Sequence, residues 1–85
     1  MINHFAGSFV IKLLELGFQA TMFYNKERIT FRNSKGNTVY FDFGNVTPSV
    51  NCFKQTASCY QIREQLLSEE KVQEVVNTIK EKLKL

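Results

Sequence analysis

The chain has 85 residues, of which 44% are hydrophobic and 22% charged, and its formal net charge is +3. This length makes one domain, residues 1–85, and leaves no room for a second. A chain of this size buries only about 60 to 65% of the surface that its unfolded form exposes. Because nearly every large apolar side chain is needed for one core, we expect function on a surface rather than in a deep pocket. The mild positive charge permits contact with phosphates or an acidic partner without demanding either.

The N-terminal segment, residues 2–16, has apolar side chains at the spacing of an amphipathic helix. These side chains are Ile2, Phe5, Ala6, Phe9, Val10, Leu13 and Leu14. Gly17 stands where a left-handed residue ends a helix, and Phe18 follows as its apolar contact. The helix is therefore predicted to end at about Leu16. Polar residues interrupt the apolar run, so it does not predict a membrane span.

Residues 18–43 contain seven of the 11 aromatic residues and alternate apolar with polar side chains for most of their length. This alternation predicts three antiparallel strands, at about 18–24, 28–33 and 38–43. The five residues 33–37 include a glycine and are predicted to form the second turn. That turn pairs Phe31 with Val39, Ile29 with Phe41, Arg32 with Thr38, Thr30 with Tyr40, and Arg28 with Asp42. The opposite charges of the last pair support this register.

The first turn decides which face of the first strand is buried, because a shift by one residue exchanges the two faces. A connection of two or four residues sets Tyr24 opposite Ile29 and Met22 opposite Phe31. Phe18, Ala20, Met22 and Tyr24 then join the core. A three-residue loop would instead bury Gln19, Thr21 and Phe23. We favour the even connection because it buries four apolar residues rather than one.

The second half of the chain is harder to assign. Residues 44–57 contain turn-forming residues, and Val50, Cys52 and Phe53 supply either a fourth, edge strand at 50–55 or the packing of a loop. A helix is predicted to begin near Ser58 and to include Tyr60, Ile62, Leu66 and Leu67.

Ser68 is the predicted N-cap of a final helix, and Glu69 and Glu70 lie in its first turn. The apolar stripe of that helix is Val72, Val75, Val76, Ile79 and Leu83. Its C-terminal lysines suit the helix dipole, and a nucleic-acid patch is the weaker interpretation of them. The predicted class is α+β: an N-terminal helix, a three-stranded antiparallel meander, and a C-terminal helix or helix pair packed on one sheet face.

The sequence contains no motif that predicts catalysis. The sequence predicts neither a nucleophile beside an activating base nor a pair of carboxylates across a cleft. Cys52 and Cys59 are expected to be free thiols, and two cysteines with the distant His4 are too few for a zinc site. We therefore expect no enzyme activity, no cofactor, no metal and no membrane association, and a cytoplasmic location.

The best candidate for binding is the outer face of the sheet, which is the face turned away from the helices. In the predicted registers Phe23, Thr30 and Tyr40 form a row, flanked by Arg28 on one side and Arg32 on the other. Aromatic rings beside arginines stack with single-stranded bases, and the same residue types anchor protein interfaces. We predict these five residues as the binding site. In the alternative, residues 44–57 fold back over the row and Phe53 contacts Phe23.

The segment Leu13-Leu14-Glu15-Leu16-Gly17-Phe18, leading into a hairpin, resembles the start of a HicA-type toxin. The order helix, three strands, helix also resembles the double-stranded-RNA-binding domain. HicA-type toxins carry a histidine in the sheet, and the predicted strands here contain none. The basic helix start that grips RNA in the second family is missing as well. The resemblance therefore implies a topology and assigns no function.

The leading functional prediction is a small non-catalytic protein-binding module that regulates or inhibits a larger complex. Its analogues are small proteins of phages and mobile elements, for which the location is the host cytoplasm. The alternative is a nucleic-acid-binding protein that uses the outer face of the sheet. A homodimer through an edge strand or the last helix is a further option, because edge strands have unpaired backbone groups.

Overall fold

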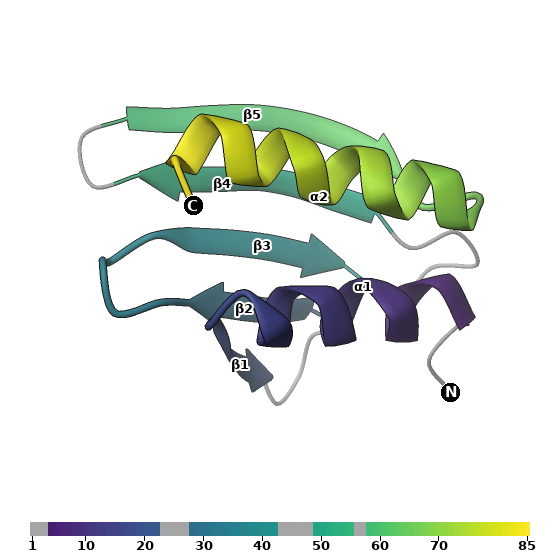
Figure 1. Cartoon of the computed structure of the whole chain (residues 1–85), viewed down its shortest axis with the longest axis horizontal. Coiled ribbons are helices and arrows are strands. Elements are labelled where there is room, and N and C mark those ends of the chain that lie inside the picture. Colours follow the sequence, from purple (N-terminus) through teal and green to yellow (C-terminus); the bar gives the residue numbers. More distant parts are fainter. Residues whose placement is uncertain (1–3, 23–27, 43–48, 56–57) are drawn as a thin grey trace.

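The computed structural model describes residues 4–22, 28–42, 49–55 and 58–85. Its elements are, in chain order, α1 (His4–Glu15), β1 (Gln19–Met22), β2 (Arg28–Arg32), β3 (Thr38–Asp42), β4 (Ser49–Gln55), β5 (Ser58–Gln65) and α2 (Glu69–Leu83). The strands form one antiparallel sheet in the order β1-β2-β3-β4-β5 (Figure 1). The predicted α+β class, with an N-terminal and a C-terminal helix around an antiparallel sheet, is confirmed.

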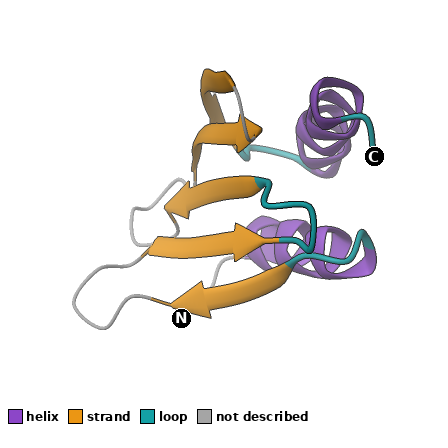
Figure 2. Ribbon diagram, turned by 90° about the vertical axis from the view of Figure 1, so that its left-hand side faces the viewer, coloured by secondary structure: helices purple, strands orange, loops and turns teal. Residues whose placement is uncertain are grey.

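Both helices lie on the same side of the sheet, and the opposite side carries no helix in the described part of the chain (Figure 2). The two helices lie side by side. Ser8 Oγ donates a hydrogen bond to Glu69 Oε2 at 2.9 Å, and Lys12 Nζ donates one to Gln73 Oε1 at 3.1 Å. Both bonds join residues 61 positions apart, so α1 and α2 run parallel.

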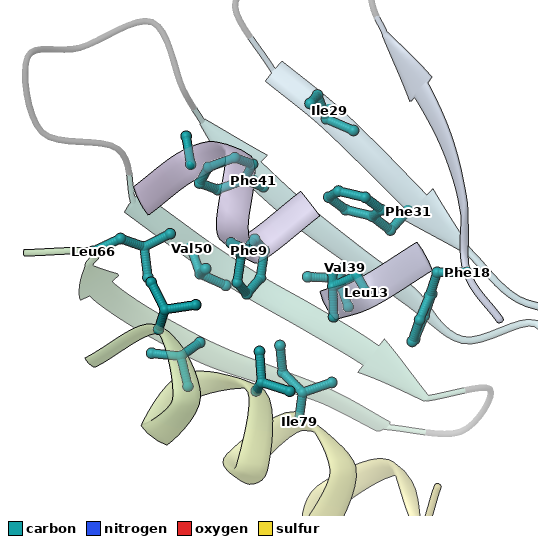
Figure 3. Packing of buried hydrophobic residues seen from close by; sticks show 14 of the residues in the cluster. Phe9, Leu13, Phe18, Ile29, Phe31, Val39, Phe41, Val50, Leu66 and Ile79 are labelled. Atoms are coloured by element: carbon teal, nitrogen blue, oxygen red, sulfur yellow. The ribbon is translucent and has the colours of Figure 1, made fainter. Parts of the chain in front are cut away.

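The end of α1 has the glycine-dependent cap that the sequence predicts at Gly17, and the helix itself ends at Glu15, one residue before the predicted end at Leu16. Gly17 has a φ of 93°, which is left-handed. Its N–H donates to the carbonyl of Leu14 at 3.0 Å, and the N–H of Phe18 donates to the carbonyl of Leu13 at 3.2 Å. These two bonds define a Schellman motif, in which the residue after the glycine contacts the last turn of the helix. Phe18 and Leu13 are both buried in the core (Figure 3).

The core lies between the helices and the inner face of the sheet (Figure 3). At its centre, the ring centroid of Phe9 lies 4.9 Å from the ring centroid of Phe41. The Phe9 ring also meets the Phe31 ring edge to face, with 6.1 Å between the two centroids. The buried hydrophobic residues are Ala6, Phe9, Leu13, Phe18, Ile29, Phe31, Val39, Phe41, Val50, Leu66, Val72, Val75, Val76, Ile79 and Leu83. Leu14 was expected among them, but 47% of it is exposed, and its neighbour Ile11 is 57% exposed. The buried stripe of α1 is therefore narrower than predicted.

The predicted β2–β3 register is confirmed at all five pairs, from Arg28 opposite Asp42 to Arg32 opposite Thr38. The residues of the turn between these strands explain why the sequence specifies this register. Gly36 takes a φ of 82°, a conformation that favours glycine. The side-chain oxygen of Asn33 accepts hydrogen bonds from the N–H groups of Lys35 and Asn37.

The predicted pairing of the first strand is wrong by two residues, although its faces are correct. Met22 lies opposite Ile29, and Ala20 lies opposite Phe31. A slide of two residues keeps every side chain on its face, so the alternation cannot distinguish the two registers. Ala20 is exposed rather than part of the core, since β1 is an edge strand. Tyr24 lies outside the described residues.

The predicted fourth strand is present as β4, but it is an interior strand, because β5 pairs with its other side. The prediction of a helix beginning near Ser58 is therefore wrong. In the pairing of β4 with β3, Tyr40 and Phe41 are opposite Cys52 and Val50, so Asn51 is an extra residue relative to β3 and reverses the alternation in β4. This bulge sets Val50 opposite Phe41 and Cys52 opposite Tyr40.

The final helix agrees closely with the prediction. The Ser68 side chain caps α2 by accepting a hydrogen bond from the Lys71 N–H at 3.1 Å. The buried residues of the helix are the predicted stripe Val72, Val75, Val76, Ile79 and Leu83. Its C-cap, Lys84, takes a left-handed φ of 56°, and its N–H donates to carbonyls of the last turn.

Candidate binding surface on the outer face of the sheet

The outer face is organised in rows that cross the strands. In the central row Thr21 is opposite Thr30, Thr30 is opposite Tyr40, and the row continues through β4 to Gln61. Because side chains alternate along a strand, residues two positions away belong to the adjacent rows on the same face. Tyr40 lies at the middle of this row, on the central strand of the sheet.

Arg28 and Asp42, in the row beside the central row, form a connected group with Tyr40. Arg28 Nε donates to Asp42 Oδ1 at 2.6 Å, and Arg28 Nη2 donates to Asp42 Oδ2 at 3.2 Å. This is the two-pronged geometry in which a guanidinium binds a carboxylate most strongly. The guanidinium carbon also lies 6.0 Å from the centre of the Tyr40 ring, a cation–π distance. The Arg28 side chain is thus held flat against the outer face beside a half-buried tyrosine.

Thr30 lies between Thr21 and Tyr40 in the central row and is only 2% exposed. Its hydroxyl is buried and has no hydrogen-bond partner within the described structure. A buried hydroxyl without a partner usually costs free energy. Thr30 therefore contributes a buried polar group to the centre of this face.

The adjacent row, nearer the β2–β3 turn, carries cations that form no ion pair with the described residues. Arg32 lies opposite Thr38, and Thr38 lies opposite Lys54 on its other side. Arg32 and Lys54 are exposed, and their backbones are separated by two strand spacings, or about 10 Å. Lys35 is exposed in the turn that joins β2 to β3. We call Arg32, Lys35 and Lys54 the turn-end cations.

The net charge of the protein is concentrated in the sheet layer. The described strands and the β2–β3 turn carry five cations, Arg28, Arg32, Lys35, Lys54 and Arg63, against two acids, Asp42 and Glu64. The helices and the residue that caps α2 carry five cations, Lys12, Lys71, Lys80, Lys82 and Lys84, against five acids, Glu15, Glu69, Glu70, Glu74 and Glu81. The excess of three on the sheet equals the formal charge of the whole chain. On the outer face the described acid is Asp42, which already pairs with Arg28.

Four of the five predicted binding residues lie on one face and in adjacent rows. These are Arg28, Thr30, Arg32 and Tyr40. The fifth, Phe23, lies outside the described residues. Phe23 was predicted to lie opposite Thr30, and Thr21 lies there instead. That these residues bind a partner stays a prediction.

Two of the turn-end cations were absent from the predicted site. Lys54 was missed because the fourth strand at 50–55 was predicted without a register, and the bulge at Asn51 decides which face Lys54 occupies. Lys35 was missed because it lies in the turn and not on a strand. The alternative in which residues 44–57 cover the row is wrong for 49–55. That stretch extends the sheet as β4, with Phe53 opposite Val39, rather than folding over it. The rest of this segment lies outside the described residues.

The edge strand β5 carries a charged residue, Glu64, on the side of the sheet that faces the helices. Glu64 of this strand accepts an ion pair from Lys71 of α2, with Nζ 2.9 Å from Oε2. The hydrogen bond that Lys71 donates to the Glu64 carboxylate raises the pKa of Lys71. Glu64 and Lys71 also line a shallow hollow with Ser49, Arg63, Gln65 and Leu67. An inward charge on an edge strand disfavours the addition of another strand, so the predicted homodimer gains no support at this edge.

No family model matches the sequence, and no curated protein or solved structure matches it either. Neither helix in the described ranges is long and apolar enough to cross a membrane. Among the described side chains, no group of three or more His, Cys, Asp or Glu residues is placed to hold a metal ion.

Proposed function

We propose that this protein is a small non-catalytic binding module that regulates or inhibits a larger complex, and that the outer face of its sheet binds an anionic partner. One observation carries the proposal. The sheet layer holds the entire excess of positive charge, and the described acid on its outer face is neutralised by Arg28. A surface of one sign attracts a partner of the opposite sign and speeds their association.

Two partner classes have the required charge. A protein with an acidic surface suits a regulator or inhibitor, and a nucleic acid offers phosphates to the same cations. The contact between Arg28 and Tyr40 favours the second class, because an aromatic ring beside a guanidinium stacks with nucleobases. Either partner would contact Arg32 and Lys54, so the first test does not depend on which class is correct.

The test compares two pairs of neutralised cations. Arg32→Gln with Lys54→Gln removes two charges from the outer face, and Lys80→Gln with Lys84→Gln removes two exposed charges from the helix layer. Both double variants have the same net charge. We expect the sheet pair to elute from a heparin column at clearly lower salt than the helix pair. Equal elution of the two variants would show that position on the outer face is irrelevant and would overturn the proposal.

A second measurement asks whether the natural partner uses the same face. Wild-type protein, the sheet pair and the helix pair are each used to capture partners from the native host, and the captured material is identified by mass spectrometry for protein and by sequencing for nucleic acid. The partner should be lost with the sheet pair and retained with the helix pair. Retention with both variants would place the interface elsewhere.

A further inference from the structure

We infer that the anionic partner of the outer face is single-stranded RNA, with one base stacked on Tyr40 and the phosphate backbone running across the strands over the turn-end cations. This inference rests on the proposed function and narrows it to one class of partner. It draws on three observations: the polar composition of the face, the position of Tyr40 and the spacing of the cations.

The described side chains of the outer face include no aliphatic residue. Apart from Tyr40 they are Gln19, Thr21, Arg28, Thr30, Arg32, Thr38, Asp42, Ser49, Lys54, Gln61, Arg63 and Gln65. The centre of a protein–protein interface is apolar and is built around several large anchors. Interfaces with nucleic acid are polar and positively charged. The composition of this face therefore favours nucleic acid over an acidic protein.

Tyr40 supplies the stacking surface. It lies on the central strand, its side chain is half-buried, and the Arg28 guanidinium is fixed beside its ring by the two hydrogen bonds to Asp42. Because the guanidinium lies over the ring, a base that stacks here covers the plane of the guanidinium and the part of the ring that is left exposed beside it. Bases inside a duplex are already stacked on one another, so this contact selects an unpaired base.

The turn-end cations lie one row away from Tyr40. Thr38, between Arg32 and Lys54, is two residues from Tyr40 along β3, a separation of about 7 Å. A nucleotide whose base contacts the ring therefore has its phosphate on the side of the cations. The line from Arg32 to Lys54 crosses β2, β3 and β4, so the backbone of the bound strand runs across the strands rather than along them.

We expect polar side chains in the rows of Tyr40 and of the cations to favour RNA over DNA. Thr21 and Gln61 lie in the same row as Tyr40, and Gln19 lies opposite Arg32 in the row of the cations. All three are exposed. Hydroxyl and amide groups both donate and accept hydrogen bonds, as the 2′-hydroxyl of ribose does. We therefore expect weaker binding of the corresponding DNA.

The test measures fluorescence anisotropy of a labelled 12-nucleotide oligouridylate over a range of salt concentrations. Three phosphate contacts predict a slope of about −2 for log K against log salt. Tyr40→Leu should weaken binding at least about fivefold, the loss of one stacked base, while Tyr40→Phe retains it. The sheet pair of neutralised cations should flatten the slope to about −0.7, and the helix pair should leave it unchanged.

Three comparisons decide between this inference and its alternatives. A 12-base-pair RNA duplex or oligothymidylate bound as tightly as the oligouridylate would overturn the assignment to single-stranded RNA. Equal binding by Tyr40→Leu and wild type, with both variants folded by circular dichroism, would overturn the stacking.

Polyglutamate separates the failure of the inference from that of the proposed function. If polyglutamate binds through Arg32 and Lys54 and the oligouridylate does not, the inference fails and the proposed function stands. If neither polymer depends on these cations, both fail.

Discussion

Arg28 donates two hydrogen bonds to the carboxylate of Asp42 across the β2–β3 pair, with nitrogen–oxygen distances of 2.6 and 3.2 Å. The pair sits on the open face of the sheet and has two effects there. It holds the guanidinium in place beside Tyr40, and it neutralises the one acid described on that face. An ion pair that fixes register in the fold thus also shapes the surface available to a partner.

Asp42→Asn tests the second effect. The pair is partly exposed, so we expect the free energy of unfolding to fall by about 1 kcal/mol or less. The variant adds one positive charge to the outer face, and its elution from heparin should move to higher salt. Glu81→Gln adds the same charge to the helix layer and is the control. An equal shift in both variants would contradict a binding role for the outer face.

Thr30→Val tests the buried hydroxyl in the central row. Valine has the same branched shape and lacks the group that has no partner within the described structure. We expect the free energy of unfolding in urea to stay equal or to rise by up to about 2 kcal/mol. Thr21→Val, on an exposed neighbour in the same row, should change it by less than about 0.5 kcal/mol. A marked loss of stability in Thr30→Val would show that the hydroxyl is hydrogen-bonded.

The same substitution at two glycines should have opposite effects. Gly17→Ala places a side chain on a residue with a φ of 93° and should lower the free energy of unfolding by about 1 to 2 kcal/mol. Gly7→Ala lies within α1, and beyond the neighbouring helix backbone no atom comes within 4 Å of the added methyl group, so this substitution should raise the free energy of unfolding by about 0.5 to 1 kcal/mol. In a domain of this size, 1 kcal/mol shifts the melting temperature by about 4 to 8 °C. Shifts of the same sign would refute the helix cap as described.

Phe9→Ala tests the centre of the core. The ring is fully buried and contacts two other aromatic rings, so its removal should cost about 3 to 5 kcal/mol. For a small domain this is a large part of the total stability. Ile11→Ala on the same helix removes a side chain that is 57% exposed and should cost far less. Chemical denaturation of the two variants in parallel gives the comparison, and similar losses would contradict the assigned core.

The elements that the sequence predicts well are those with two independent local signals. In α2 the cap at Ser68 agrees with a stripe of valines at helical spacing, and both are found. The β2–β3 hairpin combines alternation with a glycine turn and an oppositely charged pair, which fix one register. Arg28 and Tyr40 could be placed on a common face because this register was specified locally.

The remaining errors have physical causes. Sliding β1 by two residues keeps the same faces, and no glycine-containing turn specifies its length. The segment 58–65 has apolar residues whose spacing suits a short helix as well as a strand, and its pairing with β4 decides the outcome. The extra residue Asn51 reverses the alternation within β4, so no regular pattern could assign Lys54 to the outer face.

The parallel packing of α1 and α2 also has a consequence for the order of folding. The helix that packs beside α1 is α2, and the five strands of the meander lie between these two helices in the chain. Contacts between such distant segments form slowly, because the intervening chain must be ordered first. Until α2 is complete, the apolar side of α1 lacks the contacts that α2 provides. We therefore expect the nascent chain to be prone to aggregation until α2 has been synthesised.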